Sequence, residues 1–285
     1  MILAFGWDRA DCGIPIACFS GFPRVPPVRE TTQRALDNGG WSLIDFHMCT
    51  APNSKKIKIA LEELSLEHRT FKYSIQDGEH LTPEFREINP NLRLPAIVDH
   101  DPPDGGAPLN VFESGSVLQY LAEKTGKLIP TEFRARLLAF EWMTWQVAGL
   151  GPMMGQAGHF LRYAPKDLDH TYSAQRYLNE SRRLMRVLDN RLKRGRYLAG
   201  EEYSIADIAC WPVAMDFGRG LGIDFADHPN VARWDEDIRA RPAVQRMIDS
   251  PEFVPGPESD RVRVLTEEQR SNNFGENLMK AVIED

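Results

Sequence analysis

Leu94 and Pro95 stand at the start of an apolar run that reads as a strand. Proline cannot donate a hydrogen bond to a sheet ladder, so its place at a strand needs a reason. One reason is a cis Leu94-Pro95 peptide bond, because cis bonds are scarce and usually belong to turns. Such a turn would leave the Leu94 backbone free to pair with an extended peptide, as in strand addition. An ordinary proline at the start of a strand is the alternative.

Glu113 and Ser114 could bind the charged groups of a peptide that pairs with the Leu94 backbone. They lie between a predicted strand, Leu109–Phe112, and a predicted helix that begins at Ser114. A helix N-terminus offers free N–H groups and the positive end of its dipole to a carboxylate, while Glu113 can take an ammonium group. Together with Leu94, the pair predicts a site for a small peptide. Ser114 as a plain N-cap is the alternative.

The elements around these residues predict a thioredoxin-like α/β domain. A strand, a helix and a parallel strand come first, in the spacing of a right-handed βαβ unit. A short helix, two strands and a last helix complete the domain. The predicted elements are a strand at Trp41–Met48, a helix at Ser54–Leu64, a strand at Arg69–Ile75, a short helix at Thr82–Glu87, strands beginning at Pro95 and Leu109, and a helix from Ser114.

Beyond a linker at Lys127–Thr131 the pattern is helical only. Predicted helices lie at Glu132–Val147, Tyr172–Arg194, Ile205–Phe217, Val231–Ala240 and Ala243–Asp249. Ser204 and Asp207 have the spacing of a capping box, whose role we expect to be structural. We therefore divide the chain into an N-terminal extension (1–40), a thioredoxin-like domain (41–126), an all-helical domain (132–250) and a C-terminal extension (251–285). The last is a polar tail anchored by Phe274 and Leu278, expected to wrap its own body or a partner.

Composition excludes several classes of function. The 285 residues carry a modest net charge of −7 with no basic face, so we expect no nucleic-acid partner. No stretch approaches the length of a membrane span, so we expect no membrane association. The four cysteines show neither metal-ligand spacing nor a dense disulfide pattern, so we expect no metal and a reducing, cytoplasmic location.

Several segments together resemble the glutathione S-transferase family, and within it the nu class of bacterial glutathione-dependent disulfide-bond oxidoreductases. The matching segments are Pro52-Asn53, Asn89–Asn91, Leu94–His100, Phe112–Gly115, Tyr120–Lys124, Gly149–Met153 and Tyr203–Asp207. The resemblance extends over residues 41 to 241. It implies the fold of that family, a homodimer, and glutathione as co-substrate, with one or two molecules in each pocket.

The resemblance also implies which residues hold glutathione. They are Asn53, His80, Leu94, Pro95, Glu113, Ser114, Gln156 and Arg176. His80 stands where the nu class has a glutamine, and a solvated loop histidine is its alternative. The guanidinium of Arg176 offers a fork to a carboxylate, or it pairs with charges on its own helix. His159, Phe160 and Tyr163 are expected to form the wall of a second-substrate site, although aromatic residues at this spacing are also common in cores.

The first βα turn, Cys49 to Asn53, would lie above a helix start and beside this site. Lowering a thiol pKa from about 8.5 to about 7 takes roughly 2 kcal/mol of thiolate stabilisation. A helix end supplies about 0.3–1 kcal/mol and a hydrogen bond to a charged group about 1.5–3 kcal/mol. The helix end plus the Asn53 amide or the Thr50 hydroxyl is therefore sufficient, and the turn contains no tyrosine.

Asn53 and Thr50 are not equal candidates for this catalytic role. The nu-class pattern has threonine directly before Pro-Asn, but here Ala51 intervenes, which favours Asn53. Asn53 as an N-cap is the alternative. Cys49 is the rival thiolate, but it stands too early in the turn and has no second cysteine near it. A small buried residue at a strand end is the better interpretation of Cys49.

We therefore expect an enzyme, a glutathione-dependent disulfide-bond oxidoreductase. The thiolate of bound glutathione would attack a disulfide sulfur, and a second thiol would complete the exchange. A glutathione transferase or ether-cleaving enzyme, in which the same thiolate attacks a carbon of an aromatic electrophile, is one alternative. A non-catalytic glutathione-binding module is the other.

Overall fold

The computed structural model describes residues 44–253 and 265–283. The predicted N-terminal extension, residues 1–40, lies outside the described residues, as do the first residues of the predicted first strand. Its expected packing over the body of the protein therefore stays a prediction.

A four-stranded sheet forms the first part of the described chain, in the order β2-β1-β3-β4. The strands are β1 (Ile44–Met48), β2 (His68–Lys72), β3 (Ala96–Asp99) and β4 (Leu109–Phe112). Strand β1 runs parallel to β2 and antiparallel to β3, and β4 runs antiparallel to β3. Every residue of β1 is buried, as expected for a central strand covered on both faces. The predicted βαβ unit and thioredoxin-like sheet are confirmed.

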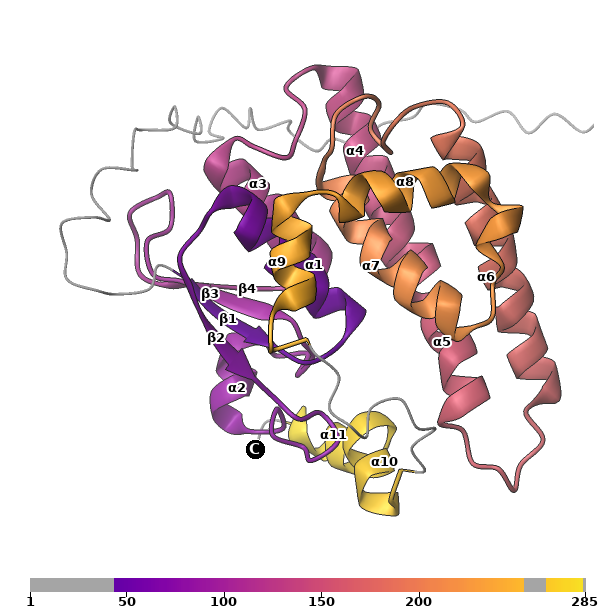
Figure 1. The fold of residues 1–285 in the computed structure, drawn as a ribbon. Helices are drawn as coiled ribbons and strands as arrows, with labels where there is room; N and C mark the ends of the chain where they lie inside the picture. Colours follow the sequence, from indigo (N-terminus) through magenta and orange to yellow (C-terminus); the bar gives the residue numbers. More distant parts are fainter. Residues whose placement is uncertain (1–43, 254–264, 284–285) are drawn as a thin grey trace, which may run out of the picture. The chain divides into compact units, whose positions relative to one another are not determined.

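Helices cover both faces of this sheet. Helices α1 (Pro52–Leu64) and α3 (Ser114–Thr125) lie on one face, and the short α2 (Pro83–Ile88) lies on the other (Figure 1). Helix α1 also packs against α7 (Ile205–Gly220) and α9 (Pro242–Asp249) from the helical part of the chain. One continuous apolar core consequently runs from β1 through α1 and α3 into α7.

The remaining helices of this part are α4 (Phe133–Trp145), a π-helical turn η1 (Gln146–Leu150), α5 (Gly151–Arg162), α6 (Thr171–Leu192), the 3₁₀ turn η2 (Phe225–Asp227) and α8 (Pro229–Arg239). Helix α5 is absent from the sequence prediction because its glycines argue against a helix. Pro152 does not oppose it, since proline in a first turn gives up an N–H that has no helical partner anyway.

The C-terminal extension adds α10 (Glu267–Phe274) and α11 (Glu276–Ala281). Leu278 and Ala281 pack against a small apolar cluster that includes Phe85 of α2. Arg86 donates a hydrogen bond to the carbonyl of Ala281 at 3.2 Å. The tail thus contacts its own chain beside α2.

The predicted capping box at the start of α7 is present, and its carboxylate is fully buried. Asp207 accepts hydrogen bonds from the N–H of Ser204 at 3.0 Å, the N–H of Leu198 at 2.9 Å and Nε1 of Trp234 at 2.9 Å. One side chain therefore fixes the start of α7, the preceding loop and helix α8.

We predict that Asp207→Ala lowers the free energy of unfolding by about 3–5 kcal/mol, because several buried donors lose their only acceptor. Urea denaturation of the purified protein measures the change. Asp224→Ala is the control, since Asp224 caps an exposed turn through the N–H of Ala226 at 2.9 Å; its cost should stay near 0.5–2 kcal/mol, roughly that of an ordinary cap. An equal decrease in the free energy of unfolding of the two variants would contradict the role of Asp207 as the shared acceptor of several buried donors.

Candidate active site

Three chain segments meet at one edge of the sheet, and each contains predicted site residues. His47, near the end of β1, pairs with Ala96 at the start of β3, and Ala96 pairs with Phe112 at the end of β4. Because β3 runs antiparallel to both neighbours, the turn after β1, the residues before β3 and the residues after β4 emerge together. These are the Cys49–Asn53 turn, Leu94-Pro95 and Glu113-Ser114. The predicted cis Leu94-Pro95 bond is present.

Glu113 occupies the N-cap of α3, with Ser114 in the first helical position. The predicted alternative of Ser114 as N-cap is therefore wrong. Glu113 has a φ of 65°, a left-handed conformation that residues other than glycine rarely adopt and that is common at ligand sites. Its Oε1 accepts a hydrogen bond from the amide of Asn91 at 3.3 Å. The carboxylate is exposed, so it can receive a cation from solvent.

Helix α1 begins with Pro52, and its N-cap is Ala51. The alternative role of Asn53 as N-cap is therefore wrong, because the proline brings the helix start forward by two residues. Asn53 lies in the first turn and is exposed, as is Thr50 just before the helix. Neither side chain has a hydrogen-bond partner within the part of the chain that the structure describes. Both are free to donate to a ligand at the positive end of α1.

Cys49 is only 4 % exposed, and its Sγ lies 3.9 Å from the hydroxyl of Ser54. Burial raises the pKa of the Cys49 thiol to about 11, which outweighs the hydrogen bond with Ser54 and the nearby charge of Arg93. The thiol is protonated at neutral pH. This confirms the interpretation of Cys49 as a small buried residue and removes it as a ready nucleophile.

His80 lies in the loop after β2 and is 1 % exposed, so its alternative as a solvated loop histidine is wrong. Neither ring nitrogen has a hydrogen-bond partner among the described residues. Burial, followed by the charge of Arg93, lowers the pKa of His80 to about 4. The ring is therefore neutral at physiological pH and retains one donor and one acceptor.

The other predicted ligand contacts lie in the helical part of the chain. Gln156 on α5 is exposed, and so is Arg176 on α6. Nη1 of Arg176 lies 3.9 Å from Oε2 of Glu180 on the same helix. This weak surface ion pair corresponds to the alternative role of Arg176, pairing with charges on its own helix. The ring of Phe160 stacks parallel to Tyr177 at 5.6 Å, an arrangement typical of a helix–helix contact.

His159 and Tyr163 contact a residue of the C-terminal extension. The ring of Phe274 on α10 lies 4.7 Å from His159 and 6.1 Å from Tyr163, between ring centres. The same extension reaches the α/β part, because Arg93 donates to the carbonyl of Asn273 at 3.3 Å. Asn272 donates to the carbonyl of Gln76 at 3.0 Å, in the loop that leads to His80. The segment from Asn272 to Phe274 thus links the loop of His80 to the predicted second-substrate wall.

Lys56 is a site residue that the sequence analysis missed. It is 1 % exposed, and its Nζ donates to Oγ of Ser114 at 3.2 Å and to Oε1 of Gln146 at 2.6 Å. Burial lowers the pKa of Lys56 to about 7. A signal was present, because Lys56 precedes Ala60 by four residues and so shares the apolar face of α1.

The described residues contain no group of three histidine, cysteine, aspartate or glutamate side chains placed to hold a metal ion. No helix among them has the length and apolar character to cross a membrane.

Comparison with known proteins gives the family. Residues 50–124 match the sequence family described as the N-terminal domain of glutathione S-transferase, and residues 152–242 match its C-terminal domain. The chain is 48 % identical over 206 residues to the disulfide-bond oxidoreductase YfcG of Escherichia coli K12, which covers 72 % of this chain and 94 % of that protein.

Solved structures agree. A glutathione transferase from Burkholderia graminis, with two glutathione molecules bound per subunit, has a TM-score of 0.69 and 39 % identity and covers 76 % of this chain and 92 % of its own. A glutathione transferase from Pseudomonas putida, with one glutathione disulfide bound per subunit, has a TM-score of 0.70 and 36 % identity and covers 76 % of this chain and 96 % of its own. With its thioredoxin-like sheet and helical second part, this chain belongs to the glutathione S-transferase family.

Proposed function

We propose that this protein is a glutathione-dependent disulfide-bond oxidoreductase of the glutathione transferase type, with the site described above as its active site. The main support is the meeting of Leu94-Pro95, Glu113-Ser114 and the start of α1 at one sheet edge. Cys49, the cysteine found at this edge in the described part of the chain, is a buried, protonated thiol, so we assign the reactive sulfur to the ligand. The likeness to YfcG, whose name states this activity, supports the same conclusion. Membership of the nu class is part of this proposal, supported by the same likeness.

In the proposed complex the sheet edge at Leu94 pairs with the glutathione backbone. Glu113 takes the ammonium group, and Ser114 with the N-terminus of α3 takes the adjacent carboxylate. The ring nitrogens of His80 are buried, so His80 can donate a hydrogen bond to glutathione only where the ligand displaces part of the chain that covers it. Gln156 and Arg176 add contacts from the helical part, and His159, Phe160 and Tyr163 bound the second substrate.

The proposed reaction is a thiol–disulfide exchange in two steps. The thiolate of one glutathione, held by the Asn53 amide and the positive end of α1, attacks one sulfur of the disulfide and forms a mixed disulfide. The other sulfur leaves as a thiolate and takes up a proton. A second glutathione thiolate then attacks the glutathione sulfur of the mixed disulfide, which yields glutathione disulfide and the second product thiol. Relatives with two glutathiones or one glutathione disulfide per subunit fit this sequence.

The second candidate function is attack of the same thiolate on a carbon atom, as in conjugation or ether cleavage of an aromatic electrophile. The contact of Phe274 with His159 and Tyr163 favours it, because aromatic rings near the site suit an aromatic substrate. A binding module without catalysis is the remaining alternative, and retained Asn53, Glu113 and Ser114 argue against it.

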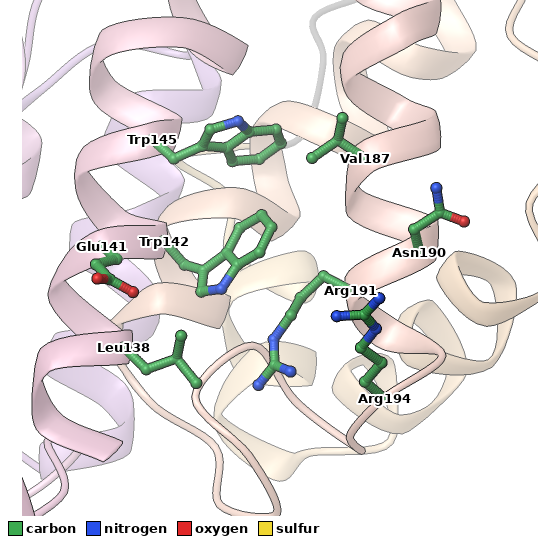
Figure 2. A pocket seen from close by; sticks show the side chains of 8 residues that line it. All are labelled: Leu138, Glu141, Trp142, Trp145, Val187, Asn190, Arg191 and Arg194. Carbon is green, nitrogen blue, oxygen red and sulfur yellow. The ribbon is translucent and has the colours of Figure 1, made fainter. Parts of the chain in front are cut away.

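We also propose that the protein is a homodimer in the cytoplasm. A hollow of about 550 Å³ lies between α4 and α6, with Trp142 and Trp145 facing Val187 and Arg191 (Figure 2). Phe133 and Leu137, which precede these tryptophans on α4, and Val147, which follows them on η1, also have exposed side chains. A partner copy is the natural cover for such an apolar helix face. The buried free thiols of Cys49 and Cys210 are compatible with a reducing compartment.

We predict that reduction of a small disulfide by glutathione exceeds conjugation of an aryl halide, and that it depends on Asn53. Asn53→Ala removes one donor to the thiolate, so kcat should fall roughly ten- to hundredfold with a smaller change in KM. The melting temperature should stay within a degree or two of the wild type, roughly what an exposed non-capping residue implies.

Thr50→Ala is the matched control, because Thr50 is exposed in the same turn but precedes the helix. We expect a smaller effect on kcat than for Asn53→Ala. A native rate of disulfide reduction in Asn53→Ala would assign the thiolate to another donor and favour the conjugating or ether-cleaving function.

We further predict that Cys49→Ser retains most of the disulfide reductase activity. The substituted side chain is buried and its thiol is protonated, so its sulfur takes no part in the exchange. Circular dichroism confirms folding and a coupled assay with glutathione reductase measures turnover. Loss of nearly all turnover in a folded variant would show that the protein uses its own thiol.

A further inference from the structure

Lys56 joins three elements beneath the proposed binding site. It projects from α1, and its Nζ contacts Ser114 at the start of α3 and Gln146 at the start of η1. Both partners are neutral. No carboxylate in the described part of the chain lies within ion-pair distance of Nζ. Burial of an ammonium group without a carboxylate partner is costly, so the position calls for an explanation beyond stability.

The contact with Gln146 fixes the orientation of the lysine head group. Lysine can only donate as an ammonium, so the amide oxygen of Gln146 faces Nζ at 2.6 Å and its Nε2 points away. Gly151 leaves room for that amide, because a Cβ at Gly151 would lie 2.7 Å from Nε2. The π-helical turn that begins at Gln146 brings this amide to Lys56, and such turns are frequent at functional sites.

The contact with Ser114 determines what the serine hydroxyl can do. When Nζ is an ammonium it donates to Oγ, so the hydroxyl proton must be donated to some other acceptor. When Nζ is a neutral amine, its lone pair can accept that proton, and the hydroxyl then presents only lone pairs elsewhere. The protonation state of Lys56 therefore decides whether Ser114 can donate to a carboxylate or would repel it.

We propose that Lys56 is a positioning residue for glutathione: its buried ammonium directs the Ser114 hydroxyl proton toward the γ-glutamyl carboxylate and adds positive charge behind it. The carboxylate in question is the one next to the ammonium group assigned to Glu113. This proposal rests on the proposed function and deepens it, since it names a recognition device beneath the binding surface.

If Lys56 acts in this way, the affinity for glutathione should depend on pH. Because burial lowers the pKa of Lys56 to about 7, the group is partly neutral just above neutral pH. The titratable groups that face it are Glu113 at the N-cap of α3 and Cys210 from α7. The Glu113 carboxylate favours the charged form of Lys56, whereas burial raises the pKa of the Cys210 thiol and keeps that thiol neutral, so it adds no charge here. A bound carboxylate stabilises the ammonium further. Binding above pH 7 should therefore take up a proton, and affinity should fall as the pH rises.

Titration calorimetry with S-methylglutathione tests this, because that ligand has no thiol to titrate. At pH 7.5, measurements in two buffers of different ionisation enthalpy should give an uptake of roughly half a proton or more per site for the wild type. Lys56→Met should abolish the uptake. Lys55→Met is the matched control: Lys55 is the neighbouring residue, pairs with Asp216 of α7 at 2.7 Å and should leave the uptake unchanged.

A comparison of two ligands separates positioning from a purely structural role. Lys56→Met should weaken S-methylglutathione binding roughly ten- to hundredfold, the effect of losing a hydrogen bond to a charged group. It should weaken the S-methylated analogue without the γ-glutamyl carboxylate, 4-aminobutyryl-cysteinylglycine, less than about threefold, because that analogue lacks the group recognised.

Each outcome decides the matter. Unchanged affinity of Lys56→Met for S-methylglutathione would overturn the proposal, since the ammonium would then contribute nothing to recognition of the carboxylate. Equal weakening of both ligands by Lys56→Met would also overturn it, since the lysine would then act only on the structure. Failure of the wild type to bind S-methylglutathione at all would instead refute the proposed function and the inference with it.

Discussion

The burial of helix α1 from two sides is the constraint on which the rest of the structure depends. The helix covers one face of the sheet and also packs against α7 and α9, and its side chains Ile57 and Leu61 are fully buried in the shared apolar core. A helix in this position leaves little room for exposed charge, so even Lys56 and Lys58 are largely covered. Fixed polar partners offset the cost of this burial: Lys58 pairs with Glu62 and Glu252, and Lys56 donates to Gln146 and to Ser114 of the proposed site.

The same constraint aligns the N-termini of two helices at one sheet edge. Helix α1 begins after β1 and α3 begins after β4, and β3 lies between these strands. Both helix starts therefore face the same region, next to Leu94-Pro95. A ligand there meets two positive helix ends, which suits a molecule with both a carboxylate and a thiolate. Glutathione is such a molecule, and the protein needs no thiolate of its own.

The C-terminal extension also lies next to the region around Leu94-Pro95 and the two helix starts. Its residues contact the loop of His80 and Arg93 on one side and the end of α5 on the other. His80 is nearly inaccessible and Phe274 covers part of the predicted second-substrate wall. The proposed second-substrate wall is therefore in contact with a segment that is far away in sequence from His159 and Tyr163.

Local patterns in the sequence determined most of the fold and much of the candidate site. Apolar runs and helical apolar periods predicted the strands and most of the helices up to α9, because burial of a face imposes such patterns directly on the chain. The helices α5, α10 and α11 were not predicted. Leu94-Pro95 was recognisable because proline is unusual at a strand, and Glu113-Ser114 because the pair combines a carboxylate with a predicted helix start beside that strand. The capping box of Ser204 and Asp207 is a contact between near neighbours and was readable for the same reason.

Only the tertiary structure decided the features that depend on distant partners. Lys56 looks like one of several solvated lysines until α3 and η1 close over it, and Asn53 looks like a cap until Pro52 starts the helix ahead of it. Helix α5 forms despite its glycines because packing against α6 and α7 outweighs their weak propensity. Burial and charge at these positions arise mainly from residues that are remote in sequence. The local pattern, such as the place of Lys56 on the apolar face of α1, indicates burial but not the partners.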